Sequence, residues 1–361
     1  KMIQIFLRLY NFIQVLSLRS YNKLIAVLQF FKLNKIPEFR EMKLSIRPTL
    51  QNVLNARKRI MPHIIRTPLL NYYGIDEMLD AKVFIKHENF QHLGSFKVRG
   101  ALNTISQLTS EEKNKGVISS STGNFGQGVA YGGRIFGVNV VIVVPENTTS
   151  TKVASIKSLG AKIIEHGQGF DDARQFAEKL SVEEGYYYIH SANEPRLVEG
   201  TGTYTLEILE DQPDIDVIIV PIGGGSGACG ACIVSNAVNP NIKVIGVQSH
   251  DSPGAYFSWK DGKITEKSNK SLAEGLATSM GYEFTQQILQ EMLDDFILVS
   301  DKELLEAVVL FADKTHSIVE HAGAAPLAAA LQIKDQLKGK KVALIASGGN
   351  LSLSQLKDAL N

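Results

Sequence analysis

The fold class follows from the stretch Val217-Ile218-Ile219-Val220-Pro221-Ile222-Gly223-Gly224-Gly225-Ser226-Gly227. Its first half is apolar without alternation, which is typical of a strand that helices bury on both faces. The glycine-rich turn that follows presents several backbone N–H groups to an anion at the start of the next helix. The stretch therefore predicts α/β structure and a phosphate site formed by Gly223, Gly224, Gly225, Ser226 and Gly227. The simpler alternative is a glycine turn that only packs.

The rest of the chain repeats this alternation of strand and helix. Short apolar runs predict strands at 83–85, 117–118, 138–144, 161–164, 187–190, 244–247 and 342–346. Helical spacing predicts a helix over 49–60, followed by an extended turn at 66–70. A chain of 361 residues is long enough for two domains. We therefore expect a largely parallel α/β protein.

Composition narrows the class of protein. With 44% hydrophobic and 21% charged residues, the chain has the balance of an ordinary globular protein. Residues 1–41 hold seven Lys/Arg against two Asp/Glu, so the remainder is mildly acidic. That remainder argues against nucleic acid as a partner, because nucleic-acid binding needs a clustered basic face. Cys229 and Cys232 are the only cysteines, which is too few for a disulfide framework and favours a reducing compartment.

Residues 1–36 differ from the rest of the chain. Their polar positions recur every three or four residues and leave a wide apolar face on an expected helix. The longest uncharged runs, 9–18 and 24–31, fall short of the roughly 18 residues that span a bilayer, so no membrane span is expected. The segment is either an organellar targeting peptide or an extension that the function of the protein does not need. We favour the extension and a cytoplasmic location.

A candidate nucleophile lies in Gly94-Ser95-Phe96-Lys97-Val98-Arg99-Gly100-Ala101. A lysine amine attacks only when it is neutral, so apolar neighbours or a nearby cation must disfavour its charge. Phe96 and Val98 flank Lys97, and Arg99 lies two residues further on. By itself the pattern also fits a solvated helix face, and the other segments decide between the two interpretations.

Two more polar turns follow predicted strands. Ser119-Ser120-Ser121-Thr122-Gly123-Asn124-Phe125-Gly126-Gln127 combines hydroxyls, an amide and glycine-flanked N–H groups, which suit a carboxylate and a phenolic oxygen. Ser347-Gly348-Gly349-Asn350 places a lone hydroxyl after another strand. Because the carboxyl ends of parallel strands meet at one edge of a sheet, we expect the three turns to line one site. Glu320 either faces the same site or is a helix-terminus charge.

A nicotinamide cofactor is an alternative ligand for the glycine turn. Gly225, Gly227 and Gly230 match the pattern G-x-G-x-x-G, which requires an acidic residue near the end of the next strand to hold the ribose. That strand is followed by Gln248, and no acid occurs before Asp251. The sequence therefore favours another phosphate ligand over NAD.

Four segments in this order and spacing closely resemble the fold-type II pyridoxal-phosphate enzymes, namely 95–101, 121–124, 223–227 and 347–350. Within that superfamily the chain is most similar to the threonine/serine dehydratase and serine racemase group, from about Thr49 to the C-terminus. Residues 274–277 and 294–300 look dehydratase-like. The resemblance implies a fold like that of tryptophan synthase β, with two open, twisted, mainly parallel sheets covered by helices, and a homodimer.

The resemblance also implies how pyridoxal 5′-phosphate is held. Lys97 would form the Schiff base and later move the α-proton, with Phe96 packed near the cofactor ring. The loop from Gly223 to Gly227 would hold the phosphate, and Asn124 would bond the 3-hydroxyl. Ser347 would meet the pyridine nitrogen. A neutral hydroxyl there leaves that nitrogen less protonated and the cofactor a weaker electron sink, which favours prompt elimination of a β-hydroxyl.

On the substrate side, the resemblance implies that the loop formed by Ser121, Thr122, Gly123, Asn124 and Phe125 clamps the carboxylate of an amino acid. Serine racemases carry a second serine hydroxyl as the other acid/base, and here that position is Thr122, whose methyl group and stiffer χ1 fit a racemase less well. Several relatives also place acidic metal ligands after the strand that follows the glycine loop. Residues 248–254 offer only Asp251, so no metal is expected.

We therefore predict an L-threonine/L-serine dehydratase (ammonia-lyase) that eliminates the β-hydroxyl and yields a 2-oxo acid and ammonia. Serine racemase, or a lyase for another β-hydroxy amino acid, is the alternative within this chemistry. A nicotinamide-dependent oxidoreductase and a catalytically silent amino-acid-binding regulator are the alternatives outside it. The expected domains are an extension of residues 1–41, a large cofactor-binding domain of 42–115 with 194–361, and a small domain of 116–193 that closes on the substrate.

Overall fold

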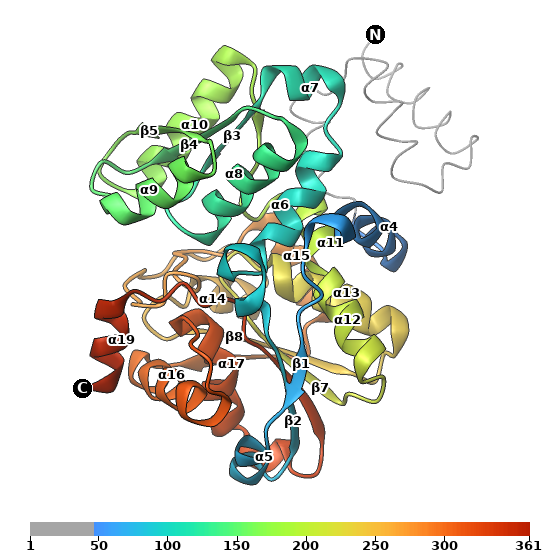
Figure 1. Ribbon diagram of the computed structural model, residues 1–361. Coiled ribbons are helices and arrows are strands. Elements are labelled where there is room, and N and C mark those ends of the chain that lie inside the picture. Colours follow the sequence, from blue (N-terminus) through green and yellow to red (C-terminus); the bar gives the residue numbers. More distant parts are fainter. Residues whose placement is uncertain (1–46) are drawn as a thin grey trace. The chain divides into compact units, whose positions relative to one another are not determined.

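Two sheets organise residues 47–361, the part of the chain that the computed structural model describes (Figure 1). The six-stranded sheet has the order β1-β2-β10-β7-β8-β9 and contains β1 (Leu69–Asn71), β2 (Lys82–Lys86), β7 (Val217–Pro221), β8 (Lys243–Ser249), β9 (Asp295–Val299) and β10 (Lys341–Ile345). The four-stranded sheet has the order β5-β4-β3-β6 and contains β3 (Val117–Ser120), β4 (Val140–Val144), β5 (Lys162–Glu165) and β6 (Tyr187–Tyr188). Neighbouring strands pair in parallel except for β1 and β2, which pair antiparallel. The predicted pair of mainly parallel sheets is confirmed.

Two of the strands were not predicted from the sequence. β1 has only three residues and overlaps the segment at 66–70 that we predicted as an extended turn. β9 begins with acidic residues, and the carboxylate of Asp294 accepts a hydrogen bond from the backbone N–H of Val244, which aligns it with β8 (2.8 Å). Both are edge strands, where the apolar run that marks a buried strand is short or interrupted. β6 is shorter than predicted, although Ile189 N–H still donates to Ile118 O (2.9 Å).

Helices cover both faces of the six-stranded sheet. They are α4 (Leu50–Ile60), α5 (Tyr73–Leu79), α11 (Pro195–Thr201), α12 (Thr203–Asp211), α13 (Ser226–Val238), α14 (Gly254–Lys260), α15 (Glu283–Met292), α16 (Asp301–Thr315), α17 (His321–Gln332), α18 (Lys334–Leu337) and α19 (Leu353–Leu360). α4 is the helix expected over residues 49–60, and Thr49 begins it with a capping box shared with Asn52. Short 3₁₀ turns occur at Met61–His63, Glu88–Phe90 and His92–Gly94.

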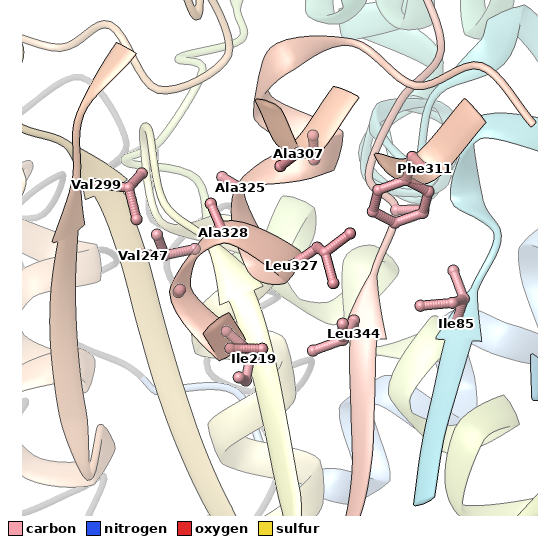
Figure 2. Packing of buried hydrophobic residues seen from close by; sticks show 14 of the residues in the cluster. Ile85, Ile219, Val247, Val299, Ala307, Phe311, Ala325, Leu327, Ala328 and Leu344 are labelled. Carbon is pink, nitrogen blue, oxygen red and sulfur yellow. The ribbon is translucent and has the colours of Figure 1, made fainter. Parts of the chain in front are cut away.

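The core of the larger sheet lies beneath α17. Figure 2 shows Ala325, Leu327 and Ala328 of this helix facing side chains such as Ile219 and Leu344 of the central strands. The alanines bring the helix close to the sheet, because they add almost no bulk between the two backbones. On the opposite face, α13 contacts β7 and β8 and is also rich in small residues. Two small-residue helices therefore hold the ends of β7, β8 and β10 in fixed positions.

The smaller sheet is covered in the same way by α6 (Lys97–Ser106), α7 (Ser110–Lys115), α8 (Asn124–Phe136), α9 (Ser150–Ser158) and α10 (Phe170–Glu184). Side chains of α6, α8 and α9 pack on the face that holds Val117 and Ile142, and α10 packs on the face that holds Ile118 and Val141. Every strand of this sheet lies within the small domain predicted for residues 116–193. The boundaries of that domain and its closure stay predictions. In residues 47–361 no helix has the length and apolar character that would let it cross a membrane.

Candidate active site

Lys97 lies at the first position of α6, in a turn that is bonded to the turn after β10. The Phe96 N–H donates to Ser347 O (3.1 Å), and Ser95 forms a β-bridge with Gly348. The Lys97 ammonium lies 4.9 Å from the centre of the Phe96 ring. Burial lowers the pKa of Lys97 to about 8, although the nearby Glu320 carboxylate opposes this shift. A lysine with this pKa carries a useful neutral fraction near physiological pH, as a nucleophile requires.

The glycine loop after β7 is held by its carbonyl groups. Thr285 Oγ1 donates to Gly224 O (2.8 Å), Thr201 Oγ1 to Ser226 O (2.9 Å), and Tyr204 Oη to Gly227 O (2.8 Å). The backbone N–H groups of residues 223–227, by contrast, donate to no acceptor within residues 47–361. A row of free N–H donors at the start of α13 is the arrangement that binds a phosphate.

Glycine is needed in this loop for steric reasons. A Cβ atom on Gly223 would lie 2.3 Å from Gly275 O, and Gly225 has a left-handed φ of +90° that disfavours any side chain. A Cβ atom on Gly227 would approach the Phe96 ring to 3.2 Å, so this ring separates the loop from the Lys97 turn. The loop therefore provides a close-fitting cradle of donors next to Lys97, and it fits the phosphate group expected there.

Asn124, at the start of α8, joins the other turns through a hydrogen-bonded chain. Its amide Nδ2 donates to both carboxylate oxygens of Glu320 (2.9 and 3.1 Å), and its Oδ1 accepts from Asn350 Nδ2 (2.7 Å). Asn350 also donates to Leu93 O (2.8 Å), four residues before Lys97. The chain joins the turn after β3, in the smaller sheet, to the turn after β10, in the larger sheet. These two turns therefore meet although their strands do not end at one edge of a single sheet, as the strand-end argument had assumed.

Glu320 belongs to this site rather than serving only as a helix-terminus charge. Its backbone N–H donates to Gly348 O (2.9 Å), and a Cβ atom on Gly348 would lie 2.7 Å from its Oε1. Burial raises the pKa of Glu320, while the hydrogen bond from Asn124 and the positive charge of Lys97 act in the opposite direction. Asn350 was present in a predicted motif but without a role, because the sequence alone does not show where its amide points.

Ser347 lies at the end of β10 with only 4% of its surface exposed. Its Oγ has no hydrogen-bond partner among residues 47–361, so this hydroxyl is free for a ring nitrogen. Its backbone carbonyl accepts a hydrogen bond from the Phe96 N–H, so Ser347 lies directly beside the turn that carries Lys97. The fit supports the implied role without requiring any rearrangement of the strand.

The loop expected to clamp the substrate carboxylate connects β3 to α8. Gly123 N–H donates to Ser121 Oγ (3.3 Å), and a Cβ on Gly126 would lie 2.7 Å from Ser121 O, so the turn is tight. Thr122 is partly exposed at its tip. The Phe125 side chain points into the core of the smaller sheet, so only its backbone could reach a substrate.

A family model described as pyridoxal-phosphate dependent enzyme matches residues 60–348. The chain belongs to this family. L-threonine ammonia-lyase from Thermotoga maritima is 35% identical to the enzyme over 87% of this chain and 78% of its own length. L-threo-3-hydroxyaspartate ammonia-lyase from Saccharomyces cerevisiae is 35% identical, over 85% of this chain and 95% of its own. The crystal structure of serine racemase from Dictyostelium discoideum has a TM-score of 0.80 at 36% identity and covers 84% and 99% of the two chains.

The enzyme therefore depends on pyridoxal phosphate, and the fold-type II architecture implied by the resemblance is confirmed. The nicotinamide alternative loses its basis, because the same glycine loop is part of the matched family segment. The individual site residues stay predictions that the geometry supports.

A buried ion cluster of Arg99, Glu88, Glu207 and Lys86 lies next to the turn that carries Lys97, and sequence analysis did not predict it. Arg99 is fully buried and bonds both carboxylate oxygens of Glu88 (2.7 and 2.8 Å) and of Glu207 (2.7 and 2.9 Å). Lys86 Nζ bonds Glu207 (2.6 Å) and Thr67 O (2.6 Å). Burial alone would lower the pKa of Arg99, but Glu88 and Glu207 raise it. They therefore keep the guanidinium charged. This cluster fixes the first turn of α6, which carries Lys97, to β2 and α12.

Proposed function

We propose that the enzyme is an L-threonine/L-serine ammonia-lyase. The observation that carries the proposal is one site that combines Lys97, whose pKa is about 8, with a cradle of free N–H donors and the neutral Ser347 hydroxyl. Ammonia-lyase relatives that match most of the chain agree with it. The catalytic residue of this proposal is Lys97.

Bound pyridoxal phosphate withdraws electrons from the Cα atom of an amino acid and so acidifies its α-hydrogen. The chain supplies the rest. The N–H groups of residues 223–227 fix the phosphate, and the Lys97 amine takes the α-proton once it is neutral. Ser347 leaves the ring nitrogen without a charged partner, which favours loss of the β-hydroxyl over a long-lived carbanion.

The polar turn before α8 holds the substrate in this proposal. Ser121, Thr122 and the backbone N–H groups of Gly123 and Phe125 bind the α-carboxylate, as N–H groups at the start of a helix bind anions, and the Gly123 N–H gives up its bond to Ser121 Oγ. Asn124 reaches the 3-hydroxyl of the cofactor by exchanging one of its present bonds, since Glu320 and Asn350 now occupy its amide.

The test measures 2-oxo acids released by the purified enzyme with added pyridoxal phosphate. L-threonine should give 2-oxobutyrate and L-serine should give pyruvate, and both should vanish in Lys97→Ala. L-threo-3-hydroxyaspartate is included because one relative is named for it. A visible cofactor band without turnover of any of the three would leave the family assignment intact and reject the proposed activity.

Racemisation of serine is the second candidate, favoured by the structural match to a serine racemase. In that case Thr122 would act as the acid/base on the face opposite Lys97. D-serine formation by the wild type, increased in Thr122→Ser and abolished in Thr122→Ala, would support the racemase. Keto-acid release that persists in Thr122→Ala without D-serine would support the lyase.

We also propose that the enzyme works as a cytoplasmic homodimer in which residues 116–193 close over the substrate. The resemblance to the family supports the homodimer and the closure, and the presence of only two cysteines supports the reducing compartment. Sedimentation velocity checks the dimer, and a fusion of residues 1–41 to a fluorescent protein checks whether they direct transport to an organelle. Those N-terminal residues lie outside the part of the chain that the structure describes, as do residues 42–46.

A further inference from the structure

Gln248 ties three segments together beside the glycine loop. It lies near the end of β8 with none of its surface exposed. Its Nε2 donates to Leu276 O (3.2 Å) and to Thr278 Oγ1 (3.1 Å), and its Oε1 accepts from Tyr256 N–H in α14 (3.0 Å). All the polar atoms of the amide are therefore used to join β8, α14 and residues 276–278.

The segment held by Gln248 forms a wall of the cofactor site. Gly275, next to Leu276, places its carbonyl oxygen against Gly223, where a Cβ atom would meet it at 2.3 Å. A Cβ atom on Gly275 would in turn lie 2.7 Å from Ala322, near the start of α17. A shift of residues 275–278 would therefore move the glycine loop and the Glu320 region together.

This position is where several relatives are expected to hold a divalent cation, but the residues here do not fit one. Hard cations need oxygen ligands, preferably carboxylates, and Gln248 instead has a neutral amide whose N–H groups point at Leu276 O and Thr278 Oγ1. Gly254 has no room for an acidic side chain, since a Cβ would lie 2.2 Å from the backbone of Ser279. Asp251, the only acid nearby in sequence, is exposed.

We propose that the neutral amide of Gln248 replaces the divalent cation, so that the cofactor site of this enzyme is assembled without a metal. The amide donates to Leu276 O and Thr278 Oγ1, so hydrogen bonds, and not bonds to a metal ion, join β8 to residues 276–278. Gln248 is thus a positioning residue for the glycine loop. The inference depends on membership of the family and not on which amino acid is the substrate.

The experiment compares the holoenzyme with Gln248→Glu and Gln248→Met. In the wild type, neither EDTA nor millimolar Mg²⁺ or Ca²⁺ should shift the melting temperature or the affinity for pyridoxal phosphate. Gln248→Glu places a carboxylate against Leu276 O, so it should melt several degrees lower and lose cofactor affinity. Added Ca²⁺ or Mg²⁺ should restore both, because the new carboxylate, Leu276 O and Thr278 Oγ1 then form a set of oxygen ligands.

Gln248→Met is the matched control, since it keeps the length of the side chain but can bind no cation. It should lose stability to a similar degree and show no response to Ca²⁺ or Mg²⁺. A wild-type enzyme that EDTA destabilises, or that binds Ca²⁺ in a calorimetric titration lost in Asp251→Asn, would overturn the proposal. So would a Gln248→Glu variant that keeps wild-type stability and cofactor affinity in EDTA. If Gln248→Glu fails to fold, the response of the wild-type enzyme to EDTA and to Ca²⁺ still decides whether its cofactor site contains a metal ion.

Discussion

Replacing Arg99 with methionine tests whether the buried ion cluster holds the turn that carries Lys97. The change removes four charge-assisted bonds, two to Glu88 and two to Glu207. It leaves two carboxylates facing the single positive charge of Lys86, with Glu88 and Lys86 fully buried and Glu207 nearly so. Removing one partner of a buried ion pair costs about 3–5 kcal/mol, because the remaining charge stays buried without compensation.

The loss should appear in the free energy of unfolding of the holoenzyme, measured by guanidinium denaturation with circular dichroism. A loss of that size is a large fraction of the roughly 5–15 kcal/mol that stabilises a typical domain. The visible band of the bound cofactor reports the Lys97 turn separately. We expect it to weaken in Arg99→Met at denaturant concentrations where the far-ultraviolet signal is still native.

Arg66→Met provides the matched control. Arg66 also bonds two carboxylates, Glu210 at 2.7 Å and Asp211 at 2.5 Å, but its side chain is 47% exposed. Pairs in contact with water contribute at most about 1 kcal/mol, so this variant should stay close to the wild type. Adding Glu88→Gln to Arg99→Met should recover part of the loss, since it removes the excess negative charge. Equal stability of Arg99→Met and Arg66→Met would refute the reasoning.

Three further changes test the site itself. The rate at which pyridoxal phosphate binds to the cofactor-free enzyme should rise with pH, with a midpoint at about 8, the pKa of Lys97. Glu320→Gln should move this midpoint to lower pH, because the Glu320 carboxylate raises the pKa of Lys97. A midpoint near the usual lysine value of about 10.4 would contradict the burial argument. Gly225→Ala and Gly160→Ala both place a side chain at a φ near +90°, each at a cost of about 1–2 kcal/mol. Only Gly225→Ala adds a contact, 3.0 Å from Thr285, so only it should weaken cofactor binding, and equal weakening in both would count against the cradle. Asn124→Asp sets a second carboxylate against Glu320, which raises the pKa of Glu320 further. The melting temperature of this variant relative to the wild type should therefore fall as pH rises above about 4.5, where both carboxyl groups ionise in the unfolded chain. A difference in melting temperature that does not change with pH would contradict this argument.

The sequence by itself determined the fold class and the class of cofactor. Apolar runs without alternation, such as Val217 to Val220, can be stable only where helices cover both faces of a sheet, so parallel α/β structure followed directly. Glycines 223–227 were recognisable because their role depends on backbone shape, whereas Lys97 was recognisable only together with the other segments that resemble the fold-type II pyridoxal-phosphate enzymes. The shape of a glycine turn is a property of a short stretch of chain, and the order and spacing of four such stretches is a property of the whole sequence. Edge strands β1 and β9 escaped prediction, because an edge does not require a continuous apolar run.

Only the tertiary structure decided how distant side chains meet. The bond from Asn124 to Glu320 spans 196 positions and the bonds from Arg99 to Glu207 span 108, and no local pattern announces either partner. The same holds for Gln248, whose sequence position showed only a missing acid, whereas its three hydrogen bonds show what the amide does instead. The strength of a hydrogen bond or ion pair changes when its atoms move by a few tenths of an ångström, and the packing of helices on the two sheets sets those positions.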